Sequence, residues 1–113
     1  MTPEQVVQKS LEGYNQRDIN AFMAVMDANV SVHNFSDGAI IMQGAPACEE
    51  VYSALFKASP NLNSTILTRT VFGNKVIDHE YITGRNGSNE AMELVLIYEV
   101  ANEKIVKITV LRK

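Results

Sequence analysis

The sequence has 113 residues, which is the size of one domain with a single hydrophobic core, so we expect one domain spanning residues 1–113. Apolar residues make up 46% of the chain and charged residues 20%, a composition that is typical of a globular protein and excludes a disordered one. The formal net charge is −3, and no run of Lys or Arg supplies the basic surface that attracts nucleic acid or an anionic membrane, so we expect neither partner.

The first ten residues, MTPEQVVQKS, contain neither the basic region nor the apolar region of a secretory signal. No apolar run approaches the roughly 20 residues that cross a bilayer, so we expect a cytoplasmic protein. Cys48 is the only cysteine, which excludes an internal disulfide and any C-x-x-C motif. We expect Cys48 to be a small buried residue on a helix.

The chain begins with a helix signal. Thr2 and Gln5 form a T-x-x-Q capping box, and the proline between them suits the first helical position, which favours a helix to near Arg17. Asp18 is a second N-cap, and the apolar spacing after it predicts a short helix that ends at about Asp27. Two helices therefore come first.

Alternating apolar and polar residues predict the first strand, from Val30 to Phe35. A Ser-Asp-Gly turn follows, and then a short segment, Ala39–Met42, that can pair with this strand. Pro46 begins a third helix, which we expect to end before Pro60. The expected buried stripe of this helix contains Cys48, Val51, Tyr52 and Leu55.

The second half of the chain is rich in Val, Ile, Thr and Tyr, and turn residues such as Gly73-Asn74 divide it into an antiparallel meander. Such long strands have to curve, and helices placed before a run of strands indicate an α+β fold in which three N-terminal-half helices close a cone-shaped sheet. Both faces of the last strands carry apolar residues, which predicts a homodimer through the outer sheet face. The four strands are Leu62–Phe72, Lys75–Thr83, Glu90–Ala101 and Lys104–Arg112.

The element order and four segments together carry a family resemblance. The segments are LEGYNQRDINAFMAVMDANVSVHNF, GAPACEEVYSALFKASPNL, GNKVIDHEYITG and IYEVANEKIVKITVL. With them the chain resembles the nuclear-transport-factor-two-like superfamily, and within it the small SnoaL-like and steroid delta-isomerase-like proteins. The resemblance implies a cone-shaped, cystatin-like barrel, a cavity between helices and concave sheet, and commonly a two-fold dimer. It does not imply one reaction, because members include isomerases, dehydratases, cyclases, hydrolases and binding modules.

Steroid isomerase chemistry needs a carboxylate base opposite an oxyanion hole made of a tyrosine and a protonated acid. By the resemblance, the position of the base falls on Asn34. The position of the tyrosine falls close to Ser10, and that of the protonated acid falls near Leu96. An amide cannot accept the proton, and neither of the other two residues matches. We therefore do not expect the steroid isomerase triad to be retained.

The triplet DHE on the Lys75 strand offers other groups that move protons. Asp78 and Glu80 point to one face of the strand, about 7 Å apart, while His79 points to the other. If their face is dry, the two acids couple and one pKa rises, so both are candidates for proton transfer. The further polar candidates, as catalytic, polarising or orienting groups, are Tyr14, His33 and Asn34.

Apolar side chains are expected to line a pocket for a small hydrophobic molecule, although the same side chains would equally fill a solid core. They are Phe22, Met26, Phe35, Tyr52, Leu55, Phe56, Leu94, Leu96 and Tyr98, together with Tyr14. The leading hypothesis is an isomerase-, dehydratase- or cyclase-like enzyme that uses acid–base chemistry without a cofactor. The sequence contains no H-x-H or H-E-x-x-H motif, so we expect no metal site.

The alternative is a non-catalytic ligand-binding or dimerisation module. In that case the DHE triplet is structural, because a strand carboxylate often pairs with a basic side chain or a backbone donor, and a strand histidine often bonds a cross-strand partner. The two hypotheses differ in whether Glu80 borders open volume.

Overall fold

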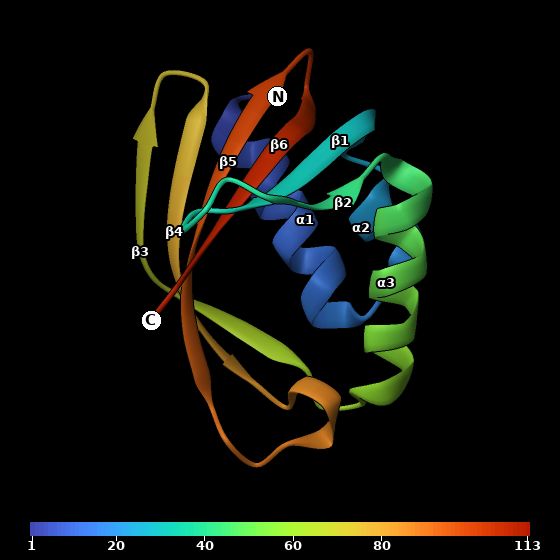
Figure 1. Ribbon diagram of the computed structural model, residues 1–113. Coiled ribbons are helices and arrows are strands. Elements are labelled where there is room, and N and C mark those ends of the chain that lie inside the picture. Colours follow the sequence, from blue (N-terminus) through green and yellow to red (C-terminus); the bar gives the residue numbers. More distant parts are fainter.

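The computed structural model describes all 113 residues as an α+β fold with three α-helices, one short 3-10 helix (η1) and a six-stranded sheet (Figure 1). This is the fold class that the sequence predicts. The elements are α1 (Pro3–Gln16), α2 (Ile19–Met23), β1 (Met26–Asn34), β2 (Ile40–Gln43), α3 (Ala45–Ala58), β3 (Asn63–Phe72), β4 (Lys75–Thr83), η1 (Arg85–Gly87), β5 (Met92–Ala101) and β6 (Lys104–Arg112).

The strands form a single sheet in the order β2-β1-β6-β5-β4-β3. Neighbouring strands are antiparallel except β1 and β6, which are parallel. The run from β3 to β6 is the expected meander, and the sheet curves around the helices (Figure 1). Hydrogen bonds do not close the sheet, because β2 and β3 remain its two edges. The helices therefore complete the wall of the cone.

Local signals explain how the first two helices form and pack. The capping box of Thr2 begins α1, and Arg17 ends it in the left-handed conformation with φ of 53°. The side chain of Asp18 accepts a backbone hydrogen bond and begins α2. Gly13 allows the two helices to touch, because a Cβ at this position would lie 2.6 Å from the backbone nitrogen of Phe22.

Two expectations about the helices are wrong. α2 ends at Met23 rather than near Asp27, because β1 begins at Met26 and pairs with β6 from that residue. The apolar run FMAVM fits a buried strand as well as a helix, and the long-range pairing decides between them. In α3, Val51 is 47% exposed, and Phe56 is buried in its place.

The hydrophobic core lies between α1 and the concave face of the sheet. Val6 and Val7 of α1 are fully enclosed, as are Val30 of β1, Val76 of β4 and Ile105 of β6. This packing fixes α1 across the strands that carry the DHE triplet and the last hairpin. None of the helices combines the length and the apolar character that a membrane crossing requires.

Candidate functional site

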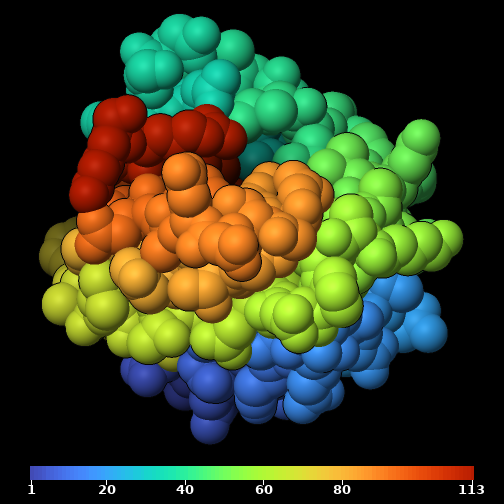
Figure 2. All heavy atoms as spheres, turned by 90° about the horizontal axis from the view of Figure 1, so that it is seen from below, coloured from blue at the N-terminus to red at the C-terminus, as the bar shows by residue number.

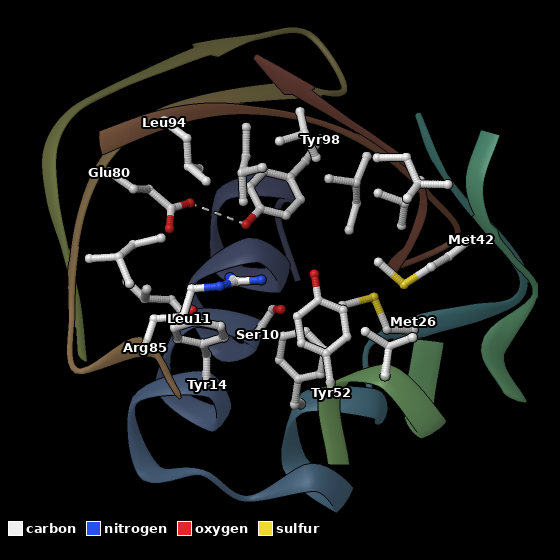
Figure 3. A pocket seen from close by; sticks show the side chains of 18 of the residues that line it. Ser10, Leu11, Tyr14, Met26, Met42, Tyr52, Glu80, Arg85, Leu94 and Tyr98 are labelled. Atoms are coloured by element: carbon white, nitrogen blue, oxygen red, sulfur yellow. Dashed lines mark hydrogen bonds between the residues drawn. The ribbon is translucent and has the colours of Figure 1, made fainter. Parts of the chain in front are cut away.

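A cavity of about 240 Å³ lies between the concave sheet face and the helices (Figure 3). All three α-helices, η1 and five of the strands contribute to its 19 lining residues, of which 15 are hydrophobic. Figure 2 shows a hollow in the surface where the C-terminal residues, the η1 segment and α3 meet. The exposed lining residues Ile41, Val51 and Arg112 belong to the segments around it. A ligand would therefore enter from this end.

Glu80 is the only acidic residue in the cavity wall, and it is 4% exposed. Ser64 donates a 2.7 Å hydrogen bond to its Oε1, and the Tyr98 hydroxyl donates a longer one of 3.4 Å to its Oε2 (Figure 3). Burial raises the pKa of Glu80 from 4.5 to about 7; the charge of Asp78 adds to this rise, while the two hydrogen bonds and Arg69 oppose it. A carboxyl with this pKa both accepts and returns a proton near neutral pH.

Three tyrosines, Tyr14, Tyr52 and Tyr98, bring hydroxyl groups to the cavity. Burial raises the pKa of Tyr14 to about 12, and it raises the pKa of Tyr52 and of Tyr98 above the usual value of 10. All three hydroxyls therefore keep their protons at neutral pH. Because Tyr98 donates its proton to Glu80, Tyr14 and Tyr52 are the ones that can donate to an oxygen of a ligand. The Tyr14 hydroxyl is buried and has no hydrogen-bond partner.

Two arginines complete the polar part of the wall. Arg85 begins η1, and its guanidinium extends into the cavity (Figure 3). The turn before it requires glycine, because Gly84 has φ of 76° and a Cβ there would lie 2.3 Å from the carbonyl oxygen of Asn61. Arg112, near the end of the chain, donates a 2.8 Å hydrogen bond to Oδ1 of Asn34. The cavity therefore combines apolar walls, one acid, two cations and several hydroxyl groups.

Comparison with known protein families assigns the chain to one of them. Residues 7–108 match the family described as the SnoaL-like domain. The chain belongs to this family. The family is part of the superfamily that the sequence resembles, so the predicted membership is confirmed. Among curated proteins, none matches the sequence significantly.

Solved structures with similar folds agree with this membership. A cystatin-fold protein from Novosphingobium aromaticivorans superposes with a TM-score of 0.89 at 20% identity, covering 99% of each chain. A candidate ketosteroid isomerase from Kribbella flavida has a TM-score of 0.83 at 14% identity, covering 98% of this chain and 77% of its own. A candidate polyketide cyclase from Sinorhizobium meliloti has a TM-score of 0.78 at 20% identity, covering 94% and 93%. At these identities the likeness establishes the fold alone.

Most of the residues that the sequence indicates for a pocket do border the cavity of this SnoaL-like domain. The position of Glu80 follows from strand alternation, because Glu80 and Ile82 on β4 both line the cavity while Tyr81 between them is 42% exposed. The predicted residues in the wall are Tyr14, Phe22, Met26, Tyr52, Glu80, Leu94, Leu96 and Tyr98.

Asp78 points to the same side of β4 as Glu80 but does not line the cavity. It is 1% exposed, and Arg69 binds both of its carboxylate oxygens, at 2.7 and 2.9 Å. The same guanidinium donates a 2.9 Å hydrogen bond to Gln8 on α1. Asp78 therefore contributes a buried ion pair that joins α1 to the sheet. His79 faces outward, with Nε2 3.4 Å from Glu93.

Five other predicted site residues lie outside the cavity wall. His33 turns to the opposite side of β1, where its Nε2 lies 2.8 Å from the hydroxyl oxygen of Ser31. Phe35 follows the end of β1 and is 50% exposed, so its expected inward position is wrong. Leu55 and Phe56 of α3 are buried behind the cavity wall, where they pack in the hydrophobic core. The five are His33, Asn34, Phe35, Leu55 and Phe56.

Sequence patterns do not indicate the two cavity arginines. Arg85 lies in the turn GRNGSN, where no periodicity reports the direction of a side chain. Arg112 had a signal, because Ile108 and Val110 occupy alternate positions before it on β6 and line the cavity too. His, Cys, Asp and Glu side chains form no group of three or more that could hold a metal ion.

Proposed function

We propose that this SnoaL-like domain is an enzyme that moves a proton within a small, largely apolar substrate, without a cofactor. The observation that carries the proposal is Glu80, a buried carboxyl whose pKa of about 7 suits proton transfer at neutral pH, in the wall of an apolar cavity. An acid placed only for stability would not need open apolar volume beside it.

In the proposed reaction, the Glu80 carboxylate takes a proton from a carbon next to a carbonyl group of the substrate. The electron pair of the broken C–H bond moves toward the carbonyl oxygen, and a tyrosine hydroxyl, from Tyr14 or Tyr52, donates a hydrogen bond to that oxygen. In a substrate with a carbon–carbon double bond next to that carbon, Glu80 then returns the proton to the far carbon of the double bond as the double bond shifts toward the carbonyl group, which gives an isomer. If a hydroxyl group leaves with that proton as water, the reaction is a dehydration.

The cavity limits the size of the substrate. Its volume of about 240 Å³ corresponds to roughly eight water molecules, at about 30 Å³ each. Pockets for drug-sized ligands commonly measure about 300 to 1,000 Å³, so the substrate is smaller than these ligands. A molecule with a single ring fits this description better than a steroid with four fused rings.

Solvent-deuterium exchange tests the reaction. Cyclohexanone and 3-cyclohexenone are incubated with the protein in deuterated buffer, and NMR follows label entering the carbon next to the carbonyl and, for the enone, the shift of its double bond. We expect a rate that rises through a pKa of about 7, and a loss of roughly 100-fold or more in Glu80→Gln. Glu93→Gln, an acid outside the cavity, is the matched control and should retain the rate.

A non-catalytic ligand-binding module is the second candidate. The hydrogen bonds that Glu80 receives from Ser64 and Tyr98 favour it, because they would also hold a structural carboxyl in place. In this case a ketone raises the melting temperature of the protein by mass action, but no label enters the ketone above the background rate. That combination would reject the enzyme.

We also propose that two copies of the chain associate through the outer sheet face. On that face Ile97 of β5 lies opposite Ile77 of β4, and Tyr81 and Leu111 nearby are 42% and 37% exposed. Such an apolar surface favours a second copy of the same sheet. Sedimentation equilibrium should find a dimer that Ile97→Lys dissociates, whereas Gln16→Lys on α1 leaves it intact. A monomeric wild-type protein would contradict this assembly.

A further inference from the structure

The cavity contains a cation that no protein group neutralises. Arg85 makes no ion pair, and its guanidinium takes part in no hydrogen bond, whereas the other three arginines all donate to oxygen atoms of the protein. Arg85 is partly buried, and its side chain reaches the cavity from η1 (Figure 3). No carboxylate and no backbone carbonyl of the protein accepts from its five N–H donors.

A second unmet donor lies next to this cation. The Tyr14 hydroxyl is fully buried without a hydrogen-bond partner, and the residue as a whole is 9% exposed. Arg85 lowers the pKa of the hydroxyl, through its charge and through contact of its guanidinium with the hydroxyl oxygen, against the larger effect of burial. The two groups are therefore close, although no hydrogen bond of ordinary geometry joins them. The Tyr14 oxygen can accept from the guanidinium, but Arg85 has no acceptor to offer in return, so the hydroxyl proton and the remaining guanidinium N–H groups still need one.

Glu80 does not supply that acceptor. Its two carboxyl oxygens already receive hydrogen bonds from Ser64 and Tyr98, and it forms no ion pair with Arg85. A wholly apolar ligand would bind unfavourably here, because it would displace the water around the guanidinium of Arg85 without providing a hydrogen-bond acceptor. A ligand that carries an anionic oxygen pair would satisfy the planar fork of the arginine and leave its own apolar part against the walls.

We propose that the ligand of this cavity is a small apolar carboxylate, whose carboxylate group binds the guanidinium of Arg85 and the hydroxyl of Tyr14. The proposal deepens the proposed function, on which it rests for the role of the site, by naming the class of substrate. The carboxylate lies toward η1, and the apolar part of the molecule extends along the hydrophobic walls past Glu80. Arg85 then determines which substrates are accepted, and Glu80 does the chemistry.

Calorimetric titration with matched probes tests this assignment. The probes are benzoate and cyclohexanecarboxylate, each compared with the corresponding primary amide, which has nearly the same shape without the charge. For the wild-type protein we expect each carboxylate to bind at least ten-fold more tightly than its amide. Equal affinities, or no measurable binding of either carboxylate, would overturn the proposal.

Variants identify the group responsible for the preference. Arg85→Gln should abolish the preference for carboxylate over amide, and Tyr14→Phe should weaken carboxylate binding several-fold. Lys107→Gln, which removes the same charge from β6 outside the cavity, should retain the preference and controls for net charge. Circular dichroism confirms that each variant is folded. A preference that persists in Arg85→Gln would place the anion elsewhere and refute the assignment.

The outcome is separable from that of the proposed function. Glu80→Gln should retain the preference for carboxylates although it loses proton exchange. If the wild-type protein prefers carboxylates but catalyses no exchange, the carboxylate site stands and the enzyme fails. If it catalyses exchange in neutral ketones and binds amides as tightly as acids, the enzyme stands and the carboxylate site fails.

Discussion

Replacing Glu80 by glutamine tests the unusual state of this carboxyl through stability alone, before any substrate is known. The pKa of Glu80 in the folded protein is about 7, against 4.5 for an ordinary glutamate, mainly because the group is buried. A raised pKa means that the folded state binds the proton more tightly than the unfolded state does. Wild-type stability therefore falls as the pH rises above about 4.5, and the loss is complete somewhat above pH 7.

The size of this loss follows from the difference between the two pKa values. Each pH unit of difference corresponds to about 1.4 kcal/mol, so ionising Glu80 in the folded protein costs roughly 3 kcal/mol of unfolding free energy. Glutamine has the same shape, and its carbonyl oxygen still accepts the hydrogen bond from Ser64. Because the amide does not ionise, Glu80→Gln lacks this part of the pH dependence. The variant should gain on the wild type as the pH rises.

Urea denaturation between pH 4.5 and 8.5 measures the effect. The difference in unfolding free energy between Glu80→Gln and wild type isolates Glu80, because the other titrating groups are common to both proteins. We expect this difference to grow by roughly 3 kcal/mol across the range, with most of the change below pH 7. Glu93→Gln should show no such gain, because Lys113 lowers the pKa of that partly exposed acid. Parallel curves for wild type and Glu80→Gln would refute the reasoning.

Three further substitutions probe the surroundings of the site. Arg69→Met should destabilise the fold by about 3 to 5 kcal/mol in urea denaturation at pH 7, because it leaves the buried carboxylate of Asp78 without its partner; a loss below about 1 kcal/mol would mean that this ion pair is dispensable. Gly84→Ala should cost more than about 1 kcal/mol in the same assay, because its positive φ and its close approach to a backbone carbonyl both exclude a Cβ. Tyr98→Phe removes a hydrogen bond that lowers the pKa of Glu80, so the midpoint of the pH–rate profile should move upward; a downward shift would contradict the assigned direction of that bond.

Much of the architecture is visible in the sequence, because strand alternation and turn chemistry are local. The two strands Lys75–Thr83 and Lys104–Arg112 have the predicted bounds, and the turns Gly73-Asn74 and Asn102-Glu103 connect the strands as expected. The boundary between α2 and β1 was not predictable in this way. It depends on pairing between β1 and β6, which are far apart in the sequence and parallel. Local patterns carry no information about such a partner.

The candidate site, like the fold, is predictable from the sequence only in part. Alternation along β4 predicts that Glu80 and Asp78 share a face, and they do. It does not predict that Arg69 from β3 captures one acid and leaves the other beside open volume, because that depends on cross-strand register and on a bulge near Ile66. Arg85 was unpredictable for a different reason, since the direction of a side chain in a turn follows from backbone angles that no repeat encodes.

The composition of the cavity wall bears on whether the space is a site or merely a core that is incompletely filled. A packing defect is bounded by apolar atoms and stays dry. Here Glu80, Arg85 and Tyr14 all reach the same space, and leaving the Tyr14 hydroxyl buried without a partner costs about 1 to 3 kcal/mol in addition to the raised pKa of the acid. A small domain has only about 5 to 15 kcal/mol of net stability, so these losses are a large fraction of the total. Such a concentration of unfavourable polar groups is the pattern expected where a fold has given up stability for function.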